Sequence, residues 1–222
     1  MFDIAPQLSG FLGRFLPPLA DGFLITLWVA VLAAPAALAC GILVLLPRIS
    51  NSLVLRTLAA SYIEVMRNTP LLLQMYLIYF GLPLLGLFPS GIACGVMAIG
   101  LQHGAFFAEV FRGGVESVGR GQWEAARSIG MRRGKVFRLV VLPLALMKVI
   151  PPSCNQLIVL VKDTSLVSAI GVMEVTLTGK VIIERTGASY EVFVAVAAFY
   201  LLLTSALGGL LRYVEARAMR RF

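Results

Sequence analysis

The sequence predicts an all-α integral membrane protein with about five transmembrane helices, and two observations lead to this fold class. Hydrophobic residues make up 59% of the 222 residues and charged residues only 14%, against about 45–50% and about 25% in soluble domains. Uncharged apolar stretches also recur at the length of about 20 residues that crosses a bilayer as a helix. A water-soluble core of this size cannot bury so much apolar surface, and the spans leave no room for a separate catalytic domain.

The apolar stretches divide the chain, residues 1–222, into spans of a single transmembrane domain. The first and last spans hold no charged residue, whereas the second has a polar first half and the fourth is interrupted by Lys162-Asp163-Thr164-Ser165. Residues 1–20 lack the basic start and apolar middle of a cleavable signal. The five predicted spans, in order, cover about 22–46, 57–82, 91–111, 149–172 and 192–211.

The basic residues predict the orientation of these spans. Of the 19 Lys and Arg residues, two lie between the first and second spans, eight between the third and fourth, and four in the C-terminal tail. Cytoplasmic segments of membrane proteins are enriched in basic residues. The sequence therefore predicts a multi-pass protein of the cell (inner) membrane with its N-terminus outside and its C-terminus in the cytoplasm. The net charge of +8 is explained by these loops, and no nucleic-acid partner is expected.

The cytoplasmic segment at about 112–148 is predicted to form two short helices rather than a linker. Trp123, Ala126 and Ile129 recur near one face of a helix, and Gly130 follows where a helix would end in a left-handed residue. A second helical pattern covers about 133–142 and is followed by Pro143, which we expect to end it. The residue pattern alone allows a rigid projection, or an amphipathic pair lying on the anionic inner leaflet of the bilayer.

The same segment resembles the coupling loop of ABC importer permeases. Glu124-Ala125-Ala126, Gly130 and Val140-x-Leu142-Pro143 follow the pattern EAA-x3-G-x9-I-x-LP, with Val140 as the one conservative departure. Four further stretches resemble the polar amino-acid branch of that family, of the histidine, glutamine and glutamate type, and the similarity covers about 51–213. These stretches are Arg67–Leu72, Ile78–Pro83, Ala108–Gly114 and Lys162–Leu166.

This resemblance implies a type I ABC importer-like permease without a catalytic site of its own. The loop would couple the chain to separate ABC ATPase subunits, which would bind ATP and magnesium, through Glu124, Ala125, Ala126, Gly130, Leu142 and Pro143. The other implied partners are a second copy or a sister permease, an extracytoplasmic substrate-binding protein and an amino-acid substrate. No cofactor or metal is expected in this chain, because its cysteines and its single histidine, His103, have no ligand partners at metal-binding spacing.

Polar residues at membrane depth predict a substrate pathway, because charged groups there usually face a bundle interior or a watery cavity. In the second span the polar positions follow three- and four-residue spacing, which predicts one common helix face. The pathway would lie among the second, third and fourth spans, with the first and fifth outside. The predicted pathway residues are Glu64, Arg67, Asn68, Gln74, Gln102, Glu109, Asn155, Gln156, Lys162 and Asp163.

Two other functions remain open from the residues, as does a purely structural role for each polar position. Glu64 can pair with Arg67 at a spacing of three residues, and His103 is expected to be a hydrogen-bonded packing residue. A secondary transporter or channel would use the intramembrane acids as a relay and would need no coupling loop. A membrane anchor for a cytoplasmic partner would need the loop but no intramembrane charges.

Overall fold

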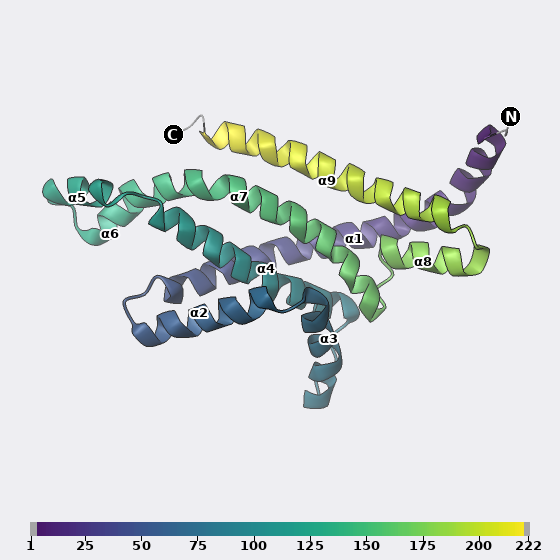
Figure 1. The fold of residues 1–222 in the computed structure, drawn as a ribbon, viewed down its shortest axis with the longest axis horizontal. Coiled ribbons are helices and arrows are strands. Elements are labelled where there is room, and N and C mark those ends of the chain that lie inside the picture. Colours follow the sequence, from purple (N-terminus) through teal and green to yellow (C-terminus); the bar gives the residue numbers. More distant parts are fainter. Residues whose placement is uncertain (1–3, 220–222) are drawn as a thin grey trace.

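The computed structural model describes residues 4–219, and every regular element among them is helical. Figure 1 shows α5 and α6 at the same end of the molecule as the C-terminal end of α9, with α8 and the start of α1 toward the other end. This arrangement places the predicted coupling segment and the C-terminal end of α9 at the same end of the molecule. The elements are α1 (Ile4–Arg48), α2 (Leu53–Asn68), α3 (Leu71–Gly81), η1 (Leu82–Leu85), α4 (Gly91–Glu116), α5 (Arg120–Ser128), α6 (Arg133–Val136), η2 (Phe137–Val141), α7 (Leu142–Asp163), η3 (Thr164–Ile170), α8 (Val175–Thr186) and α9 (Ser189–Met219).

Four stretches of the described chain are long and apolar enough to cross a membrane, and a bent pair of helices gives a possible fifth. The four are Gly13–Arg48, Gly91–Glu116, Arg133–Ile170 and Tyr190–Arg217. The bent pair joins Leu53–Asn68 to Leu71–Leu85 at an angle of 104°. This count agrees with the prediction of about five spans.

The most extensive helix contact in the described part of the chain joins α1 to α4 through small residues. A Cβ atom added to Gly100 would lie 3.2 Å from Ala36 Cβ, and one added to Gly104 would lie 2.5 Å from Cys40 Sγ. Small residues let the two backbones approach closely, which is how transmembrane helices pack in the absence of a hydrophobic driving force. The sequence analysis placed both terminal spans outside the polar helices, but α1 supplies Val29, Ala33 and Ala37 to the main core.

The second predicted span is not one straight helix. Thr69 adopts an extended conformation (φ −111°, ψ 142°) between α2 and α3, and Pro70 follows it. Proline disfavours helical geometry in the residue before it and has no N–H for the helix ladder. The predicted common face for the polar residues of this span is therefore wrong, because residues before and after Thr69 lie on helices that diverge by 104°.

The predicted helix end at Pro143 is also wrong, because α7 starts at Leu142 and continues to Asp163. Pro143 lies in the first turn of α7, where a missing N–H costs little. The five residues before it, Phe137–Val141, form a wide π-helical turn, which keeps the chain helical up to the proline. Residues 142–148 of the predicted coupling loop therefore belong to a membrane helix, as do residues 112–116, which end α4.

Helix α8 lies between the fourth and fifth predicted spans, and the fully buried side chain of Glu174 holds it against its neighbours. Glu174 caps α8 by accepting the backbone N–H of Leu177 at 2.9 Å. Its other oxygen accepts the hydroxyl of Tyr200 on α9 at 2.8 Å and that of Thr26 on α1 at 3.3 Å. One carboxyl group thus joins α1, α8 and α9 at the end of the molecule opposite α5 and α6.

Candidate functional site

The segment from α5 to η2 forms a compact projection beyond α4 and α7, and Gly130 makes its sharp turn. Gly130 has φ +83°, a conformation that costs residues with a side chain about 1–2 kcal/mol. Its N–H donates to Arg127 O at 2.9 Å, and the N–H of Met131 donates to Ala126 O at 3.3 Å. This pair of bonds is the Schellman arrangement that ends a helix at a glycine. The predicted left-handed turn at Gly130 is confirmed.

The projection has a small apolar core of its own. Ala126 and Val136 are buried in it, and the Trp123 and Phe137 rings lie 6.4 Å apart between centroids. Trp123 and Ala126 share the inner face as the spacing predicted, but Ile129 is 77% exposed because the turn at Gly130 begins there. A core that holds both short helices makes the projection a rigid body rather than a flexible tether.

The predicted coupling residues are divided between the surface and the base of this projection. Glu124 and Ala125 are exposed and Ala126 is buried, whereas Leu142 and Pro143 lie in the first turn of α7. The basic side chains of the projection are all exposed, and they give its outer surface a strong positive charge. These are Arg120, Arg127, Arg132, Arg133, Lys135 and Arg138.

On α2 the charged side chains do not pair with each other. Asn68 Nδ2 donates to Glu64 Oε2 at 2.7 Å, and the guanidinium of Arg67 lies 5.1 Å from the ring centroid of Phe106 on α4. A cation over an aromatic face is stabilised by the ring quadrupole. Glu64, Arg67 and Asn68 are all exposed in the single chain, so the polar end of α2 is open to a ligand or to another subunit.

Gln74 and Gln102 close the broken end of α2. Gln74 Nε2 donates to Met66 O at 2.9 Å and to Thr69 Oγ1 at 2.6 Å, while Gln102 Nε2 donates to Thr69 O at 2.9 Å. The last carbonyls of a helix lack partners inside the helix, and an unpaired carbonyl is costly in a membrane. The observed contacts therefore give these two predicted pathway residues a structural role at the bend.

Glu109 takes part in an ion-pair cluster toward the projection end of α4. Its carboxylate accepts from Arg112 Nη2 at 2.6 Å and lies 3.5 Å from Arg48 Nε on α1. Arg112 also contacts Glu116. Glu109 is one of the predicted pathway residues, but its carboxylate pairs with these arginines. Arg48 was not anticipated because it lies 61 positions away from Glu109 in the sequence.

The centre of α4 faces α7 through a buried polar group. His103, which is 1% exposed, lies 3.0 Å from Asp163 Oδ2 through Nε2 and 2.8 Å from Gln156 Nε2 through Nδ1. These contacts agree with its predicted role as a hydrogen-bonded packing residue, and both partners are polar side chains of α7. Asn155 and Lys162 are exposed on α7 beside this group.

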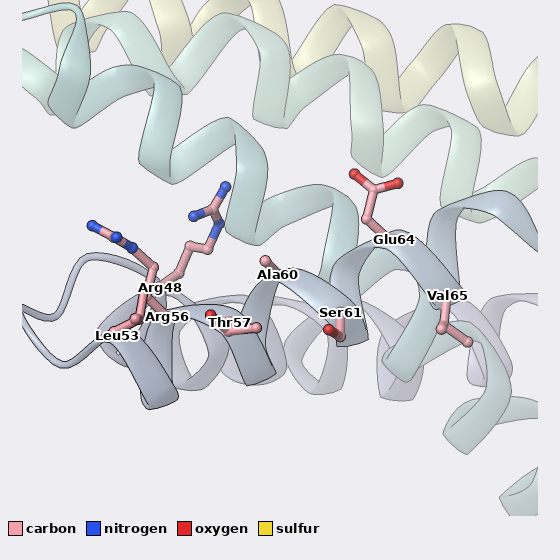
Figure 2. A pocket seen from close by; sticks show the side chains of 8 residues that line it. All are labelled: Arg48, Leu53, Arg56, Thr57, Ala60, Ser61, Glu64 and Val65. Atoms are coloured by element: carbon pink, nitrogen blue, oxygen red, sulfur yellow. The ribbon is translucent and has the colours of Figure 1, made fainter.

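A groove of about 480 Å³ runs along α2 from the end of α1. Figure 2 shows the side chains of Arg48, Arg56 and Glu64 extending toward the same side of α2. The hydroxyls of Thr57 and Ser61 also line the groove. Because Glu64 belongs to both regions, the groove continues the polar end of α2 toward the projection end of the molecule.

Comparison with known proteins identifies the family. The profile of the family described as "Binding-protein-dependent transport system inner membrane component" matches residues 34–220. The chain belongs to this family. The glutamine transport system permease of Escherichia coli (strain K12) is 39% identical over 204 residues, covering 91% of this chain and 93% of that protein. The nopaline transport system permease of Agrobacterium fabrum is 36% identical over 200 residues, covering 86% and 83%.

Solved structures agree with this membership. The chain superposes on a structure titled as an amino acid ABC transporter with histidines with a TM-score of 0.87 and 34% identity, covering 93% of this chain and 96% of that one. An inward-facing MetNI methionine ABC transporter shares the fold, with a TM-score of 0.69 at 19% identity. The predicted resemblance to ABC importer permeases and the type I fold are confirmed. As a member of this family the protein is a multi-pass inner-membrane permease, which favours neither the secondary transporter nor the simple anchor.

Proposed function

We propose that this permease carries polar amino acids or close analogues into the cytoplasm as part of an ABC importer. The observation that carries the proposal is the continuous match over residues 34–220, joined to relatives named for glutamine and nopaline transport. The importer would also contain an extracytoplasmic substrate-binding protein and a second permease, identical or related. The C-terminus and the projection face the cytoplasm in this arrangement, and the N-terminus lies outside.

The projection couples the permease to a separate ATPase, which binds the ATP and magnesium. Its rigid core and its turn at Gly130 suit the transmission of a rigid-body motion, which a flexible loop would absorb. Exposed Glu124 offers a fixed negative charge within a basic surface, and exposed Ala125 leaves room for close approach by a partner. This division of labour explains how a chain of 222 residues performs transport without catalysing a reaction.

The substrate passes along the polar groups of α2, α4 and α7. Among the described residues, Glu64, Arg67 and Lys162 form no ion pair, and the carboxylate of Asp163 pairs only with the imidazole of His103. Two cations and two anions without ionic partners complement a zwitterion, whose carboxylate and ammonium need opposite charges. Because Arg67 and Lys162 are exposed in the single chain, a second permease facing them would close the pathway from lipid.

The proposal is tested by reconstituting the permease with its ATPase and binding protein in proteoliposomes. We expect uptake of radiolabelled L-glutamine that requires ATP and the binding protein, together with ATP hydrolysis stimulated by the binding protein. Uptake that follows an ion gradient without ATP would instead establish a secondary transporter. Absence of uptake in the presence of a stable ATPase complex would establish an anchor.

The coupling role is tested at Gly130, with Gly134 as the matched control. Gly130→Val forces a β-branched residue into a left-handed conformation, whereas Gly134 in α6 has open space around a built Cβ and no positive φ. We expect Gly130→Val to lower uptake per ATP hydrolysed by tenfold or more while the protein stays in the membrane, and Gly134→Val to leave it nearly unchanged. Equal coupling ratios in the two variants would contradict the assignment.

A further inference from the structure

The histidine at the centre of α4 has a hydrogen-bonding partner at each of its two ring nitrogens. Gln156 Nε2, an amide nitrogen that only donates, lies 2.8 Å from His103 Nδ1. With the amide in this orientation Nδ1 accepts, so the proton of the neutral ring is on Nε2. That N–H then donates to Asp163 Oδ2 at 3.0 Å. The hydrogen bonds therefore run from the amide of Gln156 through the imidazole of His103 to the carboxylate of Asp163.

Asp163 lies where α7 passes directly into the 3-10 helix η3. No lysine or arginine among the described residues forms an ion pair with it, although Lys162 precedes it. Within the described part of the chain, the hydrogen bond from the buried imidazole is thus the one polar contact that holds this carboxylate in place.

The geometry leaves half of the carboxylate available. Oδ2 is occupied by His103, whereas Oδ1 has no hydrogen bond among the described residues, and the Asp163 side chain is 33% exposed. His103 itself is 1% exposed, so it does not reach a ligand directly. Lys162, the preceding residue on α7, is exposed.

We propose that His103 is a positioning residue that holds Asp163 so that its free oxygen receives the ammonium group of the substrate. The inference rests on the proposed transport of amino acids along these helices. It assigns His103 to substrate discrimination, because a molecule without an ammonium group gains nothing from a carboxylate held in this way. A packing histidine, by contrast, would affect only the stability of the α4–α7 contact.

Two substitutions separate these roles because glutamine and asparagine mimic different ring nitrogens. His103→Gln places an amide N–H near the position of Nε2 and keeps a donor for Asp163. His103→Asn reaches only to the position of Nδ1, so it keeps a partner for Gln156 and loses the bond to Asp163. Both variants replace the buried imidazole with a buried amide side chain, so we expect the two variants to fold equally well.

The assay is calorimetric binding to the permease–ATPase complex in detergent, without the binding protein. The probes are L-glutamine and its analogue in which hydrogen replaces the α-ammonium group. We expect the wild type and His103→Gln to bind L-glutamine within about threefold of each other and tenfold or more tighter than the analogue. His103→Asn should weaken L-glutamine binding by about tenfold or more, the range of one hydrogen bond to a charged group, and should bind the analogue as the wild type does.

Three results would overturn the inference, and they point to different failures. If both variants bind L-glutamine as the wild type does, or lose binding together with a matching loss of thermal stability, His103 is a packing residue. If the wild type binds L-glutamine and the analogue equally, Asp163 does not receive the ammonium group. If the wild-type complex neither binds nor transports L-glutamine, both the proposed function and the inference fail. If ATP-driven uptake is intact but the binding results contradict the inference, only the role given to His103 fails.

Discussion

Gly113 and Gly114, two adjacent glycines near the end of α4, should respond in opposite ways to the same added methyl group. A Cβ built on Gly114 would overlap Val149 Cγ2 on α7 and would lie 3.2 Å from the backbone oxygen of Ala145. A Cβ built on Gly113 meets no atom within 4 Å. Gly114→Ala should therefore force α4 and α7 apart at the base of the projection, and Gly113→Ala should not.

The comparison between the two variants isolates the packing cost. Each substitution gains up to about 1 kcal/mol of helix propensity, and this gain cancels in the difference. Overpacking a close contact costs about 1–3 kcal/mol. At ~2–4 °C per kcal/mol for a chain of this length, Gly114→Ala should unfold ~2–12 °C below Gly113→Ala.

The thermal midpoint is measured at one scan rate in detergent by tryptophan fluorescence, to which Trp123 of the projection contributes. Val149→Ala removes the overlapping methyl, so the Gly114→Ala/Val149→Ala double variant should be more stable than the sum of the single effects by about 1–3 kcal/mol. Equal midpoints for Gly113→Ala and Gly114→Ala, or strict additivity in the double variant, would refute the packing argument.

Two further predictions concern buried polar groups, both measured on the permease in detergent. Glu174→Ala removes the hydrogen-bond acceptor for Tyr200 and Leu177 and should destabilise the protein by about 3 kcal/mol. The control Glu184→Ala, at an exposed position of α8, should change the stability by less than about 0.5 kcal/mol. Equal thermal midpoints for the two variants would contradict the role of Glu174 in joining the helices. Gln102→Leu removes the hydrogen bonds that cap the end of α2. It should speed amide hydrogen exchange at residues 66–71 by about tenfold, because the local stability falls by roughly 1–1.5 kcal/mol. Unchanged exchange with reduced L-glutamine uptake would instead place Gln102 in the pathway.

The parts of the fold that sequence predicts are those with a local physical signal. Apolar runs of about 20 residues predicted the spans, and the position of Gly130 after a helical stretch predicted its left-handed turn. Both signals depend on residues close together in the chain. Pro70 also carried a local signal for the bend after α2. The sequence analysis nevertheless treated residues 57–82 as one span because of their overall hydropathy.

The candidate site could be predicted only as a set of polar residues, because its pairings join distant positions. Asp163 lies 60 residues from His103, and Met66 lies 36 residues from Gln102. Spacing within one helix cannot show which of these groups already has a partner. The structure separates them: Gln74, Gln102 and Glu109 are engaged in capping or ion pairs, whereas Arg67 and Lys162 remain without an ionic partner among the described residues.

Helices α4 and α7 connect the two functional regions physically. The end of α4 enters the projection near Gly114, and its centre carries His103; α7 begins at Leu142 beside the projection core and ends at Asp163. The two helices are in contact at both levels, through Gly114 against Val149 and through His103 against Asp163. A displacement of the rigid projection must therefore move α4 and α7 together or break one of these contacts. Gly114→Ala should accordingly lower uptake per ATP hydrolysed along with stability.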